Sequence, residues 1–126
     1  MKQVAAIAFI LTSLTGFSQV EDLSVDDYNK RINTTDKIVL VYFNAEWCMP
    51  CVKLKPVMEQ ITAEEKTSTN VLSIDVDKNP EISKHFEINT LPLFIIYRNG
   101  KKVWENNTAL SKSDIKAKID MYKEKK

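Results

Sequence analysis

The two cysteines of this 126-residue chain belong to one short unit, Cys48-Met49-Pro50-Cys51. Before this unit, Lys37–Asn44 is a continuous apolar and β-rich run, which is typical of a strand covered on both faces. After it, apolar residues recur at the spacing of one helical face, at Leu54, Val57, Met58 and Ile61. The sequence therefore predicts that both thiols lie where a buried strand leads into a helix, which Pro56 is expected to kink.

The rest of the chain alternates between helical and strand patterns. Ser24, with Asp27 three residues later, resembles an N-cap, so a helix is predicted over about 25–33. The Asn99-Gly100 dipeptide predicts a tight hairpin turn. We further expect strands at 71–76, 93–97 and 101–105 and helices at 80–86 and 111–122. This order predicts one α/β domain with a mixed sheet, in which an early βαβ unit is parallel and the last hairpin is antiparallel.

The first residues have the pattern of a secretory signal. Lys2 precedes an uncharged apolar run of 11 residues, Val4–Leu14, which is short against the roughly 20 residues of a membrane-spanning helix. Gly16 and Ser18 then place small residues beside a potential cleavage site. We expect residues 1–18 to be a cleaved signal peptide and 19–126 to be the folded domain, with a membrane anchor or a buried first strand as alternatives.

The charge balance excludes some classes of partner. The chain has 18 basic and 17 acidic residues, so its formal net charge is +1. A nucleic-acid-binding protein would need a basic stripe, and the sequence has none. We therefore expect no nucleic-acid partner and no charge-driven binding to an anionic membrane.

The Cys-x-x-Cys unit has the features of a redox site. A disulfide between residues three apart closes a very small loop, so it restrains little of the unfolded chain and would be a poor structural staple. A thiol reacts as its thiolate, and the start of a helix lowers a thiol pKa because unpaired N–H groups and the helix dipole favour an anion. Cys51 follows Cys48 by about one turn, within reach to resolve a mixed disulfide.

Metal binding is the main alternative for a Cys-x-x-Cys unit. A structural zinc site needs four ligands, and beyond the two thiols the chain offers a single histidine, His85, in a context typical of an exposed helix. Copper would require Met49 as a third soft ligand. We therefore expect neither a metal nor another cofactor.

The segment Val39–Pro56 resembles the active-site strand and helix of thioredoxins, with Trp47 before the first cysteine, Pro50 before the second and Pro56 within the helix. The similarity continues through Ile74–Pro80 and the Leu91-Pro92 corner. It also includes Asn99-Gly100 and Ala109–Lys112. The resemblance implies a thioredoxin fold, with a central mixed sheet of four to five strands flanked by helices.

The resemblance also implies residue roles. Cys48 would be the exposed nucleophile, and Cys51 the buried resolving thiol. Pro92 would be a cis proline that faces the thiols and keeps metal away, and the backbone of Leu91 would pair with an extended substrate. The remaining substrate-binding residues would be Trp47, Met49 and Pro50.

The sequence departs from the family pattern near the resolving thiol. Thioredoxins usually carry a buried Asp in the strand below that cysteine, and here the matching residue is Tyr42. A Lys that often neighbours this Asp is replaced by Ser73, and an aromatic residue is replaced by Asn44. We expect Tyr42 to be core packing, with a contact from its hydroxyl to a thiol or water as the alternative. Glu46 is expected to be a solvated charge rather than a relay.

These observations predict an exported thiol–disulfide oxidoreductase, most simply one that reduces disulfides in a bacterial periplasm. Its substrates would be protein or small-thiol disulfides, its electron donor is unidentified, and we expect a monomer. A disulfide oxidase or isomerase is the alternative within the enzyme class. A redox-inactive binding module with the same fold is the alternative outside it.

Overall fold

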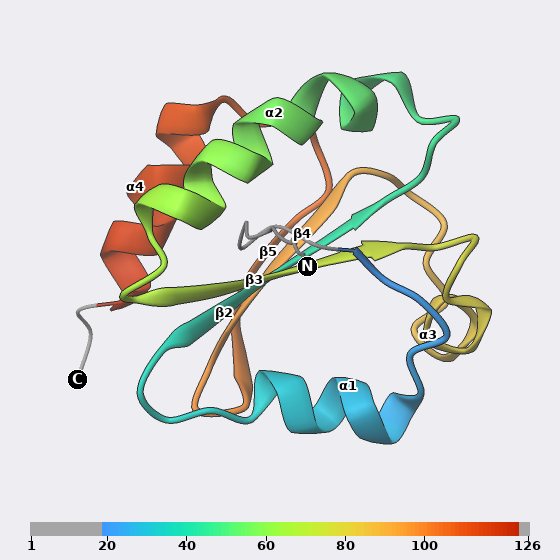
Figure 1. The fold of residues 1–126 in the computed structure, drawn as a ribbon, viewed down its shortest axis with the longest axis horizontal. Helices are drawn as coiled ribbons and strands as arrows, with labels where there is room; N and C mark the ends of the chain where they lie inside the picture. Colours follow the sequence, from blue (N-terminus) through green and yellow to red (C-terminus); the bar gives the residue numbers. More distant parts are fainter. Residues whose placement is uncertain (1–18, 124–126) are drawn as a thin grey trace, which may run out of the picture.

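The computed structural model describes residues 19–123. In chain order its elements are β1 (Gln19–Val20), α1 (Val25–Ile32), β2 (Ile38–Asn44), α2 (Met49–Glu64), β3 (Thr69–Asp75), α3 (Pro80–His85), β4 (Leu93–Arg98), β5 (Lys101–Asn106) and α4 (Lys112–Lys123). The five strands form one sheet in the order β1-β3-β2-β4-β5. Helices α2 and α4 cover one face of this sheet, and α1 and α3 cover the other (Figure 1).

The strand directions match the sequence-based expectation of a mixed sheet. Strand β3 pairs with β2 in parallel, so β2-α2-β3 is a parallel βαβ crossover unit. Strands β4 and β5 are antiparallel, and they are joined at Asn99 and Gly100 with φ values of 52° and 78°. Both positive φ values suit an Asn-Gly turn, and a Cβ added at Gly100 would stand 2.8 Å from Asn33 Oδ1. The hairpin turn is therefore confirmed, and it also packs against the end of α1.

Strand β2 is buried along its whole length and divides the core in two. Because successive side chains of a strand point to opposite faces, Ile38, Leu40 and Tyr42 pack under α2 and α4. Val39, Val41 and Phe43 pack over α1 and α3. The central strand thus supplies apolar side chains to both layers, which explains its unbroken apolar sequence.

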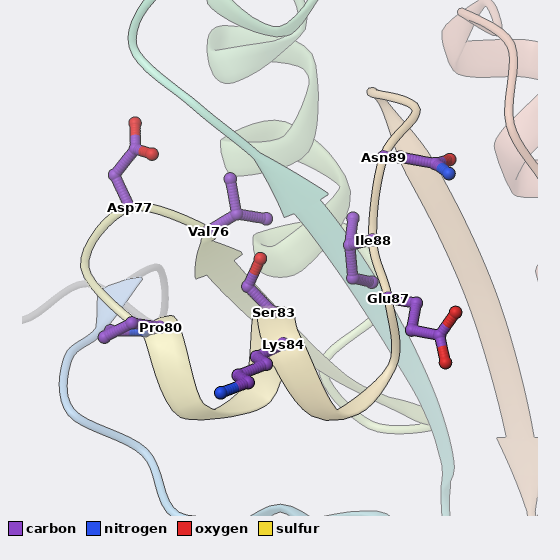
Figure 2. Close-up of a pocket in the computed structure, with 8 residues that line it drawn as sticks. All are labelled: Val76, Asp77, Pro80, Ser83, Lys84, Glu87, Ile88 and Asn89. Atoms are coloured by element: carbon purple, nitrogen blue, oxygen red, sulfur yellow. The ribbon is translucent and has the colours of Figure 1, made fainter.

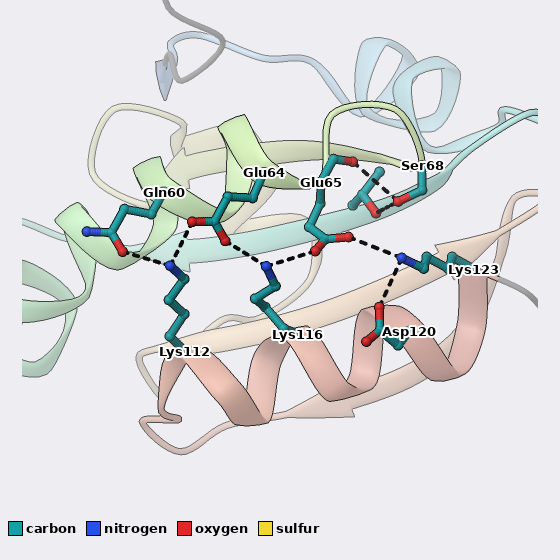
Figure 3. A network of polar contacts seen from close by, with 9 residues as sticks. Gln60, Glu64, Glu65, Ser68, Lys112, Lys116, Asp120 and Lys123 are labelled. Atoms are coloured by element: carbon teal, nitrogen blue, oxygen red, sulfur yellow. Dashed lines mark hydrogen bonds and ion pairs between the residues drawn. The ribbon is translucent and has the colours of Figure 1, made fainter.

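Helices α2 and α4 are joined by a group of charged side chains, which we call the α2–α4 clamp and which consists of Glu64, Glu65, Lys112, Lys116 and Lys123 (Figure 3). Lys116 Nζ lies 2.6 Å from Glu64 Oε1 and 3.1 Å from Glu65 Oε2. Glu65 is mostly buried, whereas Glu64 is partly exposed. The clamp therefore fixes the C-terminal end of α2 against α4.

The structure differs from the sequence-based expectation at a few boundaries. The segment after residue 18 shows no strand pattern in the sequence, but Gln19–Val20 pairs with β3 as a short edge strand. Strand β3 begins at Thr69 rather than at about residue 71, because Thr69 and Asn70 pair with the first residues of β2. Helix α2 continues through Pro56 as one element. The expected signal peptide, residues 1–18, lies outside the described residues, and within 19–123 no helix is both long and apolar enough to cross a bilayer.

Candidate active site

The two cysteines lie at the first turn of α2, as the sequence predicts. Cys48 is the N-cap residue, and its Sγ accepts a hydrogen bond from the backbone N–H of Cys51 at 3.3 Å. The two residues form a disulfide with a Cα–Cα distance of 5.2 Å. Pro50 occupies the second helical position, where the missing N–H would have had no partner within the helix. The first sulfur therefore lies where backbone N–H groups favour a thiolate.

The burial of Cys48 differs from the expectation of an exposed nucleophile. Cys48 is only 6% exposed and Cys51 only 3%, so both residues are buried in the disulfide form. The exposed groups are instead their neighbours, since Trp47 is 67% exposed and Met49 63%. Val52, one turn after Cys48 on α2, is 47% exposed. Exposed apolar side chains thus flank the two cysteines along the chain, and the cysteines themselves contribute little to the surface.

Trp47 is held by a residue that the sequence reasoning missed. Its indole Nε1–H donates to Asp77 Oδ2 at 2.8 Å. Asp77 follows β3, and Asn44, at the end of β2, pairs with Asp75 in the parallel register. Because both strands end at the same edge of the sheet, the loop after β3 reaches the segment that leads to Cys48. That shared edge is the signal that would have identified Asp77.

The second segment of the site is the corner before β4. The Leu91-Pro92 peptide bond is cis, and Pro92 is buried. Strand β4 runs antiparallel to β2, and Leu93 pairs with Phe43. Strand β4 therefore begins where β2 ends, and this register brings Leu91 and Pro92 to the edge of the sheet that carries the cysteines.

Tyr42 lies beneath the start of α2. Its ring is almost fully buried and stacks on Phe94 with a centroid distance of 5.2 Å. Its hydroxyl donates to the carbonyl oxygen of Cys51 at 3.1 Å. Burial raises the pKa of the Tyr42 phenol, so the hydroxyl stays protonated at neutral pH. The expectation of core packing is met, and the hydroxyl contacts the helix backbone rather than a thiol.

A cavity of about 460 Å³ lies beside the resolving cysteine, and below we call it the Cys51 cavity. Asn44 Nδ2 donates to Ser73 Oγ at 3.0 Å, and this pair forms part of the cavity wall. The lining residues are Gln19, Tyr42, Asn44, Ala45, Glu46, Cys51, Val52, Lys55, Ser73 and Lys78. Of the two cysteines, Cys51 is the one that lines it.

A second depression of about 540 Å³ lies between the end of β3, α3 and the loop that leads to Leu91 (Figure 2). Its walls are partly apolar and partly charged. The apolar walls come from Val76, Pro80 and Ile88, and the charged ones from Asp77, Lys84 and Glu87. The depression shares Asp77 with the Trp47 contact, so it continues the surface around the disulfide.

Within residues 19–123 no group of three or more histidine, cysteine, aspartate or glutamate side chains is arranged to hold a metal ion. His85 is exposed on α3, where its ring contacts Phe86 at a centroid distance of 4.7 Å. Its surroundings in the described part of the chain are therefore those of a surface side chain.

Comparison with known proteins assigns the family. The family model described as Thioredoxin matches residues 19–121. A thioredoxin of Chlorobaculum thiosulfatiphilum is 37% identical over 96 residues, which cover 76% of this chain and 89% of that protein. The chain belongs to the thioredoxin family. A thioredoxin of Ictalurus punctatus is 38% identical over 92 residues, covering 72% of this chain and 85% of the relative.

Solved structures agree with this assignment. A mutant thioredoxin from Halobacterium salinarum NRC-1 superimposes with a TM-score of 0.72 at 26% identity, over 91% of this chain and 99% of that one. The predicted thioredoxin fold is confirmed. This thioredoxin-family protein is a thiol–disulfide oxidoreductase that carries its cysteine pair, Cys48 and Cys51, at the start of α2.

Proposed function

We propose that this thioredoxin-family protein reduces disulfides of exported proteins in a bacterial envelope. The observation that carries the proposal is the Cys48–Cys51 disulfide at the first turn of α2, flanked in the chain by the exposed side chains of Trp47 and Met49. This arrangement combines a sulfur that the helix start favours as an anion with an apolar surface that receives a partner.

In the reducing direction the cycle begins with the dithiol form. The Cys48 thiolate attacks one sulfur of a substrate disulfide, and the other substrate sulfur leaves as a thiolate that takes up a proton. The Cys51 thiolate then attacks Cys48 Sγ in the mixed disulfide, which releases the second substrate thiolate. The substrate has gained two electrons and the protein is left as the Cys48–Cys51 disulfide. A dithiol donor must then reduce it again.

The surface around the disulfide supports a protein substrate. Trp47 is exposed but oriented by Asp77, so its ring offers an apolar wall in a fixed place. The cis corner at Leu91-Pro92 lies at the same edge of the sheet, where the backbone of Leu91 would pair with an extended segment that carries the substrate cysteine. Met49 and Pro50 would form the side of this site that belongs to α2.

The reducing direction and the location have separate support. The described elements follow one another without an inserted helical subdomain, which favours the small reductases over the larger disulfide-introducing oxidases. The location rests on the sequence of residues 1–18, where a short apolar run is followed by small residues at a potential cleavage site.

Reduction of insulin by a thiol donor tests the chemistry. Cys48→Ser should abolish turnover, because no nucleophile remains to form the mixed disulfide. Cys51→Ser should instead accumulate a covalent complex with substrate, since the resolving thiol is lost. Activity that survives in Cys48→Ser, or trapping by Cys48→Ser rather than Cys51→Ser, would contradict the assigned roles. A wild-type protein without any turnover would favour the redox-inactive binding module.

Expression of the full chain in a bacterium tests the location. We expect the protein in the envelope fraction, with Gln19 as its first residue. Protein that retains Met1 and stays in the cytosolic fraction would contradict the proposed export. That result would not bear on the proposed thiol chemistry.

A further inference from the structure

The Cys51 cavity carries charged side chains beside the resolving thiol. Its charged lining residues are Glu46, Lys55 and Lys78. Lys78 Nζ lies 3.3 Å from Glu46 Oε2, so these two charges offset each other at the cavity rim. Lys55 forms no ion pair with a carboxylate of residues 19–123. The cavity beside Cys51 therefore has a formal charge of +1, which belongs to Lys55.

Helix geometry places this charge on the side of Cys51. Lys55 follows Cys51 by four residues in α2, and side chains at that spacing are neighbours on one helical face. Both residues line the same cavity, so their side chains approach it from one wall. Lys53, which is also exposed on α2, is not among the lining residues.

The other groups that face the cavity are uncharged. Tyr42 keeps its proton because burial raises the pKa of its phenol, and Gln19, Asn44 and Ser73 have no charge. The buried carboxylate at the end of β3 belongs to Asp75, whose Oδ1 accepts the backbone N–H groups of the next turn. It does not line the cavity, so among the described residues no unpaired carboxylate faces Cys51.

We propose that Lys55 is a positioning residue that stabilises the thiolate of Cys51 through this cavity. Opposite charge close to a thiol favours its ionised form, and a partly enclosed cavity screens that attraction less than open water does. Cys51 would then lose its proton to solvent in the cavity without a carboxylate to accept it. The resulting thiolate attacks Cys48 Sγ, the bond between Cys48 and the substrate breaks, and the substrate sulfur leaves with the electron pair.

The proposal has a consequence for the redox couple. A group that stabilises a thiolate stabilises the reduced form of the protein, so Lys55 should make the couple more oxidising. This inference rests on dithiol exchange, which family membership establishes, and it holds for either direction of flux. It deepens the proposed function by naming a charge that assists the resolving thiol.

The pKa of Cys51 tests the proposal directly. In a protein whose only thiol is Cys51, made by Cys48→Ser, ultraviolet absorbance of the thiolate gives that pKa. Lys55→Met should raise it by about 0.5 to 1, because the attraction to a nearby cation is lost. Lys55→Arg should restore the original value. Glu46→Gln should lower the pKa, because it frees the charge of Lys78.

Lys53→Met is the matched control, since it removes the same charge from the same helix away from the cavity. It should move the pKa of Cys51 by less than about 0.2, as expected for a solvent-screened charge. Equal shifts in Lys55→Met and Lys53→Met, or a lowered pKa in Lys55→Met, would overturn the proposal. In the two-cysteine protein, Lys55→Met should give a more reducing potential. These pKa shifts can be measured even if wild-type protein fails to reduce insulin, so the two proposals can fail separately.

Discussion

The two ends of α2 differ in their surroundings and in the contacts that they make. At its start, the large apolar side chains of Trp47 and Met49 are exposed, an ion pair and a lysine line a cavity, and the two cysteines form a disulfide. At its C-terminal end, Glu64 and Glu65 are joined to three lysines of α4 by the α2–α4 clamp (Figure 3). The charged contacts between α2 and α4 are thus concentrated away from the reacting sulfurs.

This difference shows how one helix can provide both a rigid support and a reactive end. Its middle is fixed by buried side chains such as Met58 and Ile61, and its far end by the clamp. The first turn adds the buried Cys48 and Cys51 and a hydrogen bond from Tyr42 to the carbonyl oxygen of Cys51, while the exposed side chains of Met49 and Val52 remain available to a substrate. We expect substitutions at the start of α2 to lower activity with little change in stability. Substitutions at its C-terminal end should lower stability with little change in activity.

The largest effect is expected from Trp47→Ala at the first turn. Loss of an exposed aromatic anchor should lower kcat/KM for a protein disulfide by about tenfold to thirtyfold, while the free energy of unfolding changes by less than about 0.5 kcal/mol. Met121→Ala is the matched control, because Met121 is a large exposed apolar side chain on α4. Insulin reduction and denaturant unfolding measure the two quantities. An equal loss of activity in both variants would contradict a specific role of the start of α2 in substrate binding.

Glu65→Ala should show the opposite behaviour. Glu65 is 8% exposed, and its carboxylate lies 3.1 Å from Lys116 Nζ and 3.4 Å from Lys123 Nζ. Removing hydrogen bonds between charged, mostly buried groups should lower the free energy of unfolding by about 1 to 2 kcal/mol. Disulfide reduction at a temperature where the variant is folded should be unchanged. Glu59→Ala, at an exposed position of α2, should change neither quantity.

The smallest expected effect is a pH dependence of the clamp. Hydrogen bonds from Lys112 and Lys116 lower the pKa of Glu64 from 4.5 to about 2. A lowered folded-state pKa means that the stabilising contribution is complete above about pH 4.5 and is lost as the pH falls toward about 2. The Tm of wild type should exceed that of Glu64→Gln at pH 6, and the difference should shrink by pH 3. A difference that grows on acidification would contradict the assigned pKa direction.

Much of the first turn of α2 could be predicted from the sequence, because it depends on neighbouring residues. The change from an unbroken apolar strand to a helical period places Cys48 at the N-cap, and the structure has it there. The Asn99-Gly100 turn was equally clear, since both residues have the positive φ values that the turn needs.

The features that the sequence did not reveal depend on distant residues. Strand β1 has two residues, too few for any period, and it exists through its pairing with Ser73 and Ile74. Asp77 meets Trp47 only because β2 and β3 end at the same edge of the sheet. The clamp joins Glu64 to Lys112, residues that are 48 positions apart.

The expectation of an exposed Cys48 was wrong for the same reason. The resemblance to thioredoxins implied that exposure, but here Cys48 shares the core cluster beneath α2 with Tyr42 and Phe94. The Cys51 cavity also needs three strands and a helix to define it, so the role of Lys55 could not be inferred from the spacing of the residues alone.

The equilibrium reduction potential of the Cys48–Cys51 couple tests the proposed reducing function most directly. It is obtained from the purified protein in defined thiol–disulfide buffers, with Cys51→Ser as a control that has no such couple. We predict one reversible two-electron couple near the roughly −270 mV of thioredoxin. A value near roughly −120 mV, or no reversible couple at all, would contradict a disulfide-reducing function for this protein.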